Sequence, residues 1–138
     1  MTTVKVFFYG LFMDESQLAT KGIRPSRASI GYAEGYALRI GQRATLVRCP
    51  DSCVYGVLMD IAADEAESLY AEESVADYLP ETVTVELMDG TSAEATCYNL
   101  PGDQITGTNI RYAESLLDLA TRLHFPEYYL EQIRLARR

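Results

Sequence analysis

The chain opens with a run of valine and phenylalanine that stops at a glycine. Residues 4–8 are followed by Tyr9 and Gly10, after which the sequence becomes helix-like. The run is too short to span a bilayer and too rich in Val and Phe for a helix, so it predicts a buried first strand. Gly10 permits a turn that a side chain would obstruct, and Asp14 or Ser16 could then cap a short helix.

Such a turn leaves backbone N–H groups free at a sheet edge, where they can hold an anion or a carbonyl oxygen. The same residues are equally compatible with a plain strand end. The turn alone therefore leaves the question of a site open.

Length and charge limit what the rest of the chain can do. A sequence of 138 residues, 48% hydrophobic and 23% charged, predicts one globular domain over residues 1–138. The formal net charge of −8 argues against nucleic acid or an anionic membrane as a partner, because both require a basic face. The apolar start has no basic leader and no cleavage signal, which predicts a cytoplasmic location.

Common catalytic and metal-binding patterns are missing from the sequence. Cys49, Cys53 and Cys97 do not have zinc-ligand spacing, and His124 is the only histidine, so we expect small buried thiols and neither metal nor triad chemistry. The sequence also lacks the glycine-rich nucleotide-binding motifs. Carboxylate chemistry remains.

Most of the middle of the chain reads as strands. Residues 28–40 predict one long strand bent at Gly31 or Gly35. Turns are expected at residues 41–43, 50–52 and 89–90, strands at residues 44–47, 53–61, 81–87 and 92–100, a short helix at residues 62–70 and an acidic loop at residues 71–80.

The last third of the sequence is helical. Asn109 is a candidate N-cap, and Pro126 suits the first turn of a terminal helix. The order of strands followed by helices predicts an α+β fold with a mixed or antiparallel sheet. The expected buried stripe of the first of these helices is Ile110, Ala113, Leu116, Leu117, Ala120 and Leu123, and that of the second is Tyr129, Leu130 and Ile133.

Two acidic residues in the middle loop are the candidates for catalysis. Glu72 and Glu73 lie near the apolar Val75 and Tyr78, and a carboxylate in such surroundings can serve as a general base and acid. The other interpretation is that both are solvated loop acids of an acidic protein.

A series of short motifs resembles the γ-glutamylcyclotransferase-like family, in its avirulence-induced-gene-like branch. The first motif is the Tyr-Gly turn, and the others follow in the family's order over nearly the whole chain. They lie at residues 7–13, 54–61, 69–73 with Tyr78, 82–86, 95–98, and 125–129 with Ile133.

The resemblance implies a small mixed β-barrel with flanking helices and a polar cavity at one barrel edge. Family members act on small γ-glutamyl compounds: the α-amine of the substrate attacks its own γ-carbonyl, which forms 5-oxoproline and releases an amine. No metal or organic cofactor is implied. The implied substrate-binding residues are Tyr9, Gly10, Leu11, Phe12 and Tyr78, with Glu73 or Glu72 as the acid/base.

Departures from the family pattern limit what it implies. Leu11 replaces a Ser or Thr, so any ligand must be held by the backbone of the turn, and Ser74 replaces a Gly. Counting forward from Leu69 favours Glu73, whereas counting back from Tyr78 is compatible with Glu72.

Three hypotheses follow: a cyclotransferase, a non-catalytic small-ligand-binding protein on the same fold, and an enzyme acting on a different amide in the same cavity. The apolar faces of the last two helices suit either a core or a homodimer interface.

Overall fold

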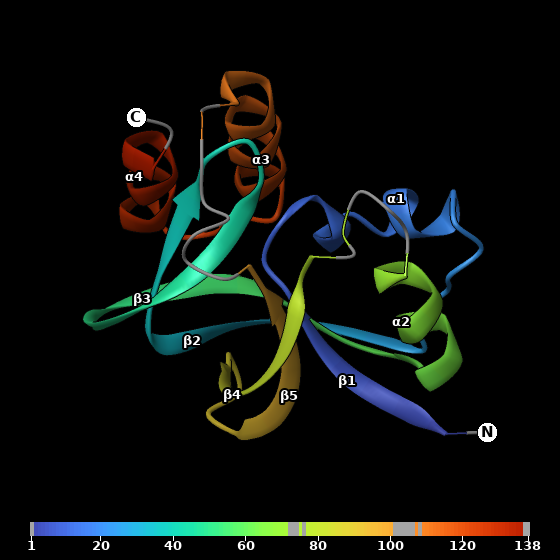
Figure 1. Ribbon diagram of the computed structural model, residues 1–138. Coiled ribbons are helices and arrows are strands. Elements are labelled where there is room, and N and C mark those ends of the chain that lie inside the picture. Colours follow the sequence, from blue (N-terminus) through green and yellow to red (C-terminus); the bar gives the residue numbers. More distant parts are fainter. Residues whose placement is uncertain (1, 72–74, 76, 101–106, 108, 137–138) are drawn as a thin grey trace.

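The computed structural model describes residues 2–71, 75, 77–100, 107 and 109–136. These residues form five strands, four α-helices and one short 3₁₀-helix, as Figure 1 shows. The strands are β1 (Thr3–Phe8), β2 (Arg27–Ile40), β3 (Ala44–Ala62), β4 (Leu79–Leu87) and β5 (Ser92–Asn99). The helices are η1 (Leu11–Met13), α1 (Glu15–Ala19), α2 (Ala63–Tyr70), α3 (Ile110–Arg122) and α4 (Glu127–Ala136).

The strands of the described chain close into a barrel in the order β1-β3-β2-β4-β5. Neighbouring strands are antiparallel except for the closing pair, β1 and β5, which is parallel at Val6 and Thr96. The fold is therefore α+β, with a small mixed barrel and flanking helices, as expected. β1 is buried on both faces, because Val6, Phe7 and Phe8 are at most 2% exposed.

The β2–β3 pair is the longest feature of the sheet, and it bends at the expected glycine. The pairing register shifts between Glu34 and Tyr36, and Gly35 between them has a φ of 88°, which favours glycine. Beyond this bulge the two strands continue as a ribbon that ends where Ile40 pairs with Ala44.

The turn expected at residues 50–52 is wrong. β3 runs without interruption from Ala44 to Ala62, so the two strands expected on either side of that turn are one strand. Pairing shows the reason: Glu34 faces Cys53 and Tyr36 faces Arg48, so residues 49–52 lie opposite Gly35 alone. The turn-forming residues therefore mark a wide bulge, where Pro50 does not need to donate to a ladder hydrogen bond.

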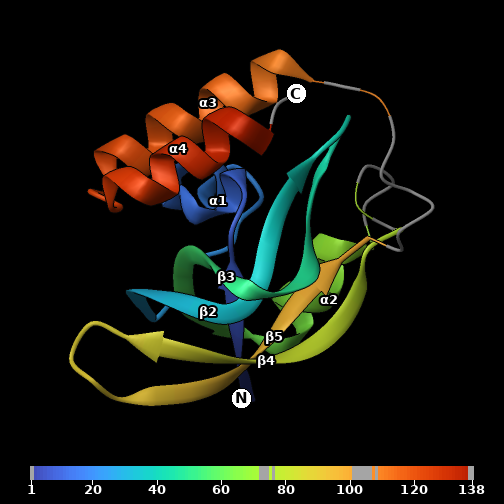
Figure 2. The same cartoon turned by 90° about the vertical axis from the view of Figure 1, so that its left-hand side faces the viewer.

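Helices α3 and α4 lie side by side above the strands (Figure 2). The Asn109 side chain accepts a hydrogen bond from the N–H of Tyr112 and caps α3, as expected. Gln132 on α4 ties the ribbon to the helix, because its side chain accepts from the Leu38 N–H at 3.1 Å and donates to the Cys53 carbonyl at 3.1 Å.

The buried stripe of α3 is shorter than expected. Ala113, Leu116 and Ala120 are buried, but Ile110 is 59% exposed. Ile110 is the first residue of the helix, and Leu117 and Leu123 are only half-buried. The expected stripe of α4, Tyr129, Leu130 and Ile133, is buried throughout.

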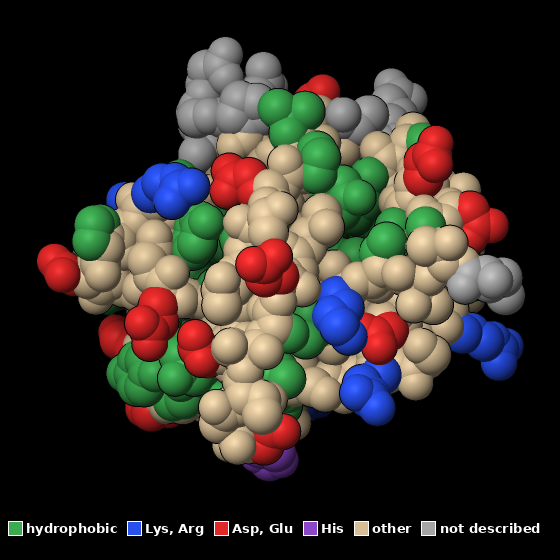
Figure 3. Space-filling view, turned by 90° about the horizontal axis from the view of Figure 1, so that it is seen from below, with side chains coloured by type: hydrophobic (Ala, Val, Ile, Leu, Met, Phe, Trp, Pro, Cys, Tyr) green, Lys and Arg blue, Asp and Glu red, His purple; other side chains and the backbone are tan. Residues whose placement is uncertain are grey.

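Among the described residues, no helix has the length and apolar character needed to cross a membrane. On the face that Figure 3 shows, several Lys and Arg side chains gather on the right of the view with Asp and Glu side chains beside them, and other Asp and Glu side chains gather at the lower left.

Candidate functional site

The chain turns sharply where β1 ends, and this turn forms one side of a cavity. The Met13 N–H donates to the Gly10 carbonyl at 3.0 Å, and the Asp14 N–H donates to the Leu11 carbonyl at 3.1 Å, which closes η1. Asp14 then caps α1 by accepting from the Ser16 N–H at 3.0 Å, one of the two expected caps. Two hydrogen-bonded helix starts thus hold the turn in place.

The cavity has a volume of about 240 Å³, which suits a small metabolite. All five residues expected to bind substrate line it, namely Tyr9, Gly10, Leu11, Phe12 and Tyr78. The structure thus brings the turn together with a tyrosine that lies 66 or more positions further along the chain. Their contact with a substrate stays a prediction.

Tyr9 contributes its ring to the lining, while its hydroxyl is used within the fold. The hydroxyl donates to the Tyr98 carbonyl at 2.7 Å, and the side chain is buried. Burial raises the pKa of Tyr9 well above its ordinary value, so the group stays neutral. Tyr9 therefore ties the end of β1 to β5.

Tyr112 is a lining residue that the sequence analysis did not identify. Its hydroxyl accepts a hydrogen bond from the Leu11 N–H at 3.4 Å, and a Cβ placed on Gly10 would overlap this hydroxyl. The expected need for glycine at the turn is therefore real, but its cause is the close approach of Tyr112 from α3. The apolar stripe of α3 gives no signal for it, because Tyr112 lies beside that stripe.

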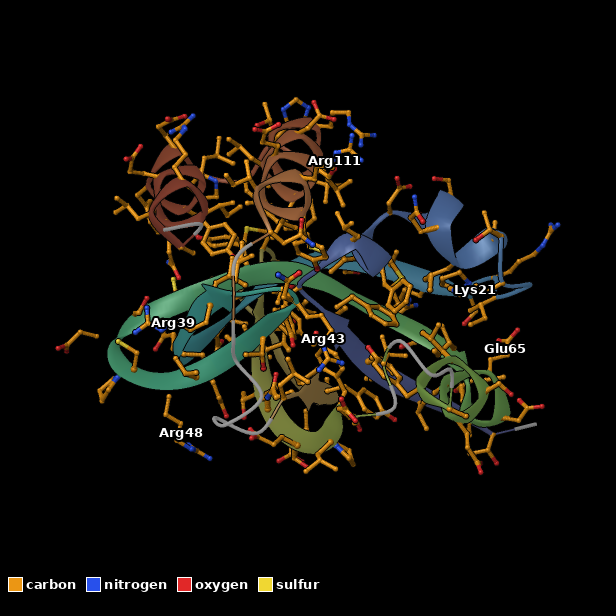
Figure 4. All side chains as sticks on the ribbon, turned by 45° about the horizontal axis from the view of Figure 1, so that its top comes forward. Lys21, Arg39, Arg43, Arg48, Glu65 and Arg111 are labelled. Atoms are coloured by element: carbon orange, nitrogen blue, oxygen red, sulfur yellow. The ribbon has the colours of Figure 1, made fainter. Side chains whose placement is uncertain are left out.

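Arg43 is a second lining residue that sequence reasoning missed. The expected turn at residues 41–43 is the tip of the β2–β3 ribbon, and it carries Arg43 to the cavity. Figure 4 places Arg43 near the middle of the molecule, whereas Arg39 and Arg48 lie on the outer part of the ribbon. Only the three-dimensional path of the ribbon distinguishes Arg43 from these two arginines.

The side chains of Arg43 and Tyr78 are in contact at the rim of the cavity. The Arg43 guanidinium lies 5.7 Å from the centre of the Tyr78 ring and forms an ion pair with Asp77 at 3.1 Å. The Tyr78 hydroxyl donates to the Ala44 carbonyl. Burial raises the pKa of Tyr78 to about 12, so its ring remains neutral beside the cation.

The two candidate catalytic residues, Glu72 and Glu73, lie outside the described residues. The residues that bound their segment do line the cavity: Tyr70 ends α2 on one side and Val75 follows on the other. Among the described residues that line the cavity, none carries a carboxylate. The assignment of Glu73 or Glu72 as the acid/base stays a prediction.

A family model described as "Gamma-glutamyl cyclotransferase, AIG2-like" matches residues 6–116. The chain belongs to this family. The matched range begins in β1 and ends within α3, so it contains every residue named above as lining the cavity. A search of curated proteins gives no significant match.

Solved structures with the same fold are distant in sequence. A protein named gamma-glutamyl cyclotransferase is 17% identical, with a TM-score of 0.75 over 96% of this chain and 87% of its own. YkqA from Bacillus subtilis is 20% identical, with a TM-score of 0.79 over 97% of this chain but only 54% of its own. A yeast γ-glutamyl cyclotransferase specific to glutathione is 14% identical, with a TM-score of 0.64 over 99% of this chain and 98% of its own. At these identities the likeness establishes the fold.

Proposed function

We propose that this protein cyclises a γ-glutamyl amine or peptide to 5-oxoproline and releases the amine, with Glu73 or Glu72 as the general acid/base. One observation carries the proposal. The turn at residues 9–12 and both ends of the segment that holds the two glutamates line the same cavity. Membership of the cyclotransferase family supports the same reaction.

The proposed reaction needs a base and hydrogen-bond donors. The carboxylate removes a proton from the α-ammonium group, the amine then attacks the γ-carbonyl, and a new C–N bond closes the five-membered ring. The C–N bond to the leaving group breaks as the protonated carboxyl returns its proton to that nitrogen. The ring nitrogen loses its second proton to the same carboxylate, which passes it to the released amine, so that the amine leaves as an ammonium ion. The reaction consumes no water, and no metal or organic cofactor takes part.

The turn supplies the donors in this proposal. Within the described residues, the N–H groups of Gly10 and Phe12 have no hydrogen-bond acceptor. N–H groups held in place by the fold can stabilise the oxyanion that forms at the γ-carbonyl. The Tyr112 hydroxyl, which already accepts from Leu11, keeps its own proton for a ligand oxygen. Leu11 has no side-chain donor to add.

The test is an assay for 5-oxoproline with a panel of γ-glutamyl amines, amino acids and peptides. We expect product from at least one compound, and we expect the substitution of the catalytic glutamate, Glu73→Gln or Glu72→Gln, to lower kcat by about 10²–10⁴-fold. Glu114→Gln is the matched control, because Glu114 is exposed on α3 and does not line the cavity.

Two results would contradict the proposal. The first is no product from any compound of the panel. The second is full activity in both glutamate variants, which would show that the protein catalyses the reaction without either glutamate as its acid/base. Circular dichroism of each variant separates loss of the fold from loss of the base.

A non-catalytic binding protein is the second candidate, and the lining favours it at one point. Leu11 places an apolar side chain at the cavity, where the family pattern has a hydroxyl. This candidate predicts that a γ-glutamyl compound raises the melting temperature in a saturable way. The compound would be recovered unchanged after prolonged incubation.

A further inference from the structure

A continuous row of aromatic rings forms one wall of the cavity. Phe8 and Phe12 meet edge to face with centroids 6.1 Å apart, and Phe12 meets Tyr70 edge to face at 6.4 Å. Tyr70 and Tyr98 are stacked, with centroids 3.7 Å apart and an angle of 11° between the ring planes. All four residues line the cavity, and we call them the aromatic wall.

The wall is neutral. Burial raises the pKa of both Tyr70 and Tyr98 above the ordinary value, so neither ring carries charge near pH 7. Among the described lining residues, Arg43 is the only one with a charged side chain, and it lies beside Tyr78. The rest of the described lining includes the amide of Gln17 and the apolar side chains of Leu11, Ala44 and Val75, so rings and apolar groups predominate and favour an apolar group in the ligand.

The γ-glutamyl half of a substrate does not match this wall. Its α-amine, α-carboxylate and γ-carbonyl require hydrogen-bond partners, and the turn at residues 9–12 offers them. Phe8 and Phe12 have no polar atom in their side chains, and a buried polar group opposite them would lose its partners. The part of the substrate that meets the wall must therefore be the leaving group.

We propose that the aromatic wall selects the leaving group, and that the preferred substrates are γ-glutamyl derivatives of aromatic amines or aromatic amino acids. This inference rests on the proposed function for its reaction. A planar ring can pack against the edge of Phe12 and the face of the Tyr70–Tyr98 stack, the two arrangements that aromatic pairs prefer.

The first test compares two substrates that differ only in a ring. γ-Glutamylphenylalanine and γ-glutamylalanine carry the same charges, so a difference in kcat/KM reports the phenyl group alone. We expect a preference of about 10- to 100-fold for the phenylalanine compound, the range for one added apolar group in a fitted pocket. ε-(γ-Glutamyl)lysine, whose leaving group has no ring, should react more slowly than γ-glutamylphenylalanine.

The second test measures the same substrate preference in a variant of the aromatic wall. Phe12→Leu keeps an apolar side chain but removes the ring, and it should reduce the phenylalanine-to-alanine ratio by about three- to tenfold. Tyr128→Leu is the control, because Tyr128 is an exposed ring on α4 that does not line the cavity. The ratio should be unchanged in this control.

Binding separates failure of this inference from failure of the proposed reaction. Calorimetry on the Glu72→Gln/Glu73→Gln double variant gives the Kd of each compound without turnover, and tighter binding of γ-glutamylphenylalanine is expected. If no compound yields 5-oxoproline but γ-glutamylphenylalanine still binds more tightly, the proposed reaction is wrong and the role of the aromatic wall in binding is retained. Equal kcat/KM and equal Kd for the two compounds, or an unchanged ratio in Phe12→Leu, would overturn the inference.

Discussion

The aromatic wall of the cavity differs from a second group of aromatic rings, which packs between α4 and the barrel and has one exposed member, Tyr128. In this packed cluster, Tyr55 on β3 lies 5.6 Å from Phe125, 5.9 Å from Tyr128 and 5.4 Å from Tyr129, measured between ring centroids. Tyr129 is 1% exposed, and the cluster joins α4 to the barrel. None of its four residues lines the cavity.

The two groups use the same kinds of residue for different purposes. Phe12, Tyr70 and Tyr98 of the wall are only half-buried, and all three line the cavity. The ten tyrosines of the sequence therefore have no single role. The position of α4 over the ribbon, and of the turn at the end of β1, decides which rings pack a core and which rings can meet a ligand.

The largest expected difference between the two groups is in stability. Tyr129→Ala should lower the free energy of unfolding by about 3–5 kcal/mol, because it opens a space inside a closed cluster. Tyr70→Ala should cost about 1–2 kcal/mol, because its ring already borders the cavity and is only half-buried. Urea denaturation measures both values. Equal losses would show that the wall is as tightly packed as the cluster.

The next effect concerns the close contact between Gly10 and Tyr112. Gly10→Ala should lower the free energy of unfolding by about 1–3 kcal/mol, because the new methyl group overlaps the Tyr112 hydroxyl. In a Tyr112→Phe background the nearest ring atom, Cζ, is 3.8 Å from the added Cβ, and most of the loss should disappear. Denaturation of the four proteins of this double-mutant cycle gives the coupling, and additive losses would contradict the assignment.

Local signals in the sequence were enough to predict much of the barrel. The valine- and phenylalanine-rich residues of β1, the caps Asp14 and Asn109, and the bend at Gly35 were all confirmed. Each depends on backbone chemistry within a few residues of the signal. Pro50 was misread because the pairing of β3 with β2, set by contacts on both sides of the bulge, overrides the local turn preference.

The cavity was only partly predictable, for a different physical reason. The turn at residues 9–12 and Tyr78 were expected from a family motif, and they line one cavity. Tyr112 and Arg43 reach it from an amphipathic helix and from a ribbon tip, and neither position has a local signature. Residues that a fold brings together from distant elements become visible only when the elements are placed in space.

The smallest expected effect compares one hydroxyl from each group of rings. The buried Tyr129 hydroxyl makes no well-formed hydrogen bond among the described residues, so Tyr129→Phe should leave stability unchanged or raise it by up to about 1 kcal/mol. Tyr112→Phe should lower stability by less than about 1 kcal/mol, because the lost contact to Leu11 is long. It should nevertheless lower kcat/KM by about three- to tenfold, the value of one neutral hydrogen bond to the substrate. A hydroxyl that only supports the turn would leave kcat/KM nearly intact. Wild-type kcat/KM in the Tyr112→Phe enzyme would therefore show that the Tyr112 hydroxyl, like that of Tyr129, does not contact the substrate.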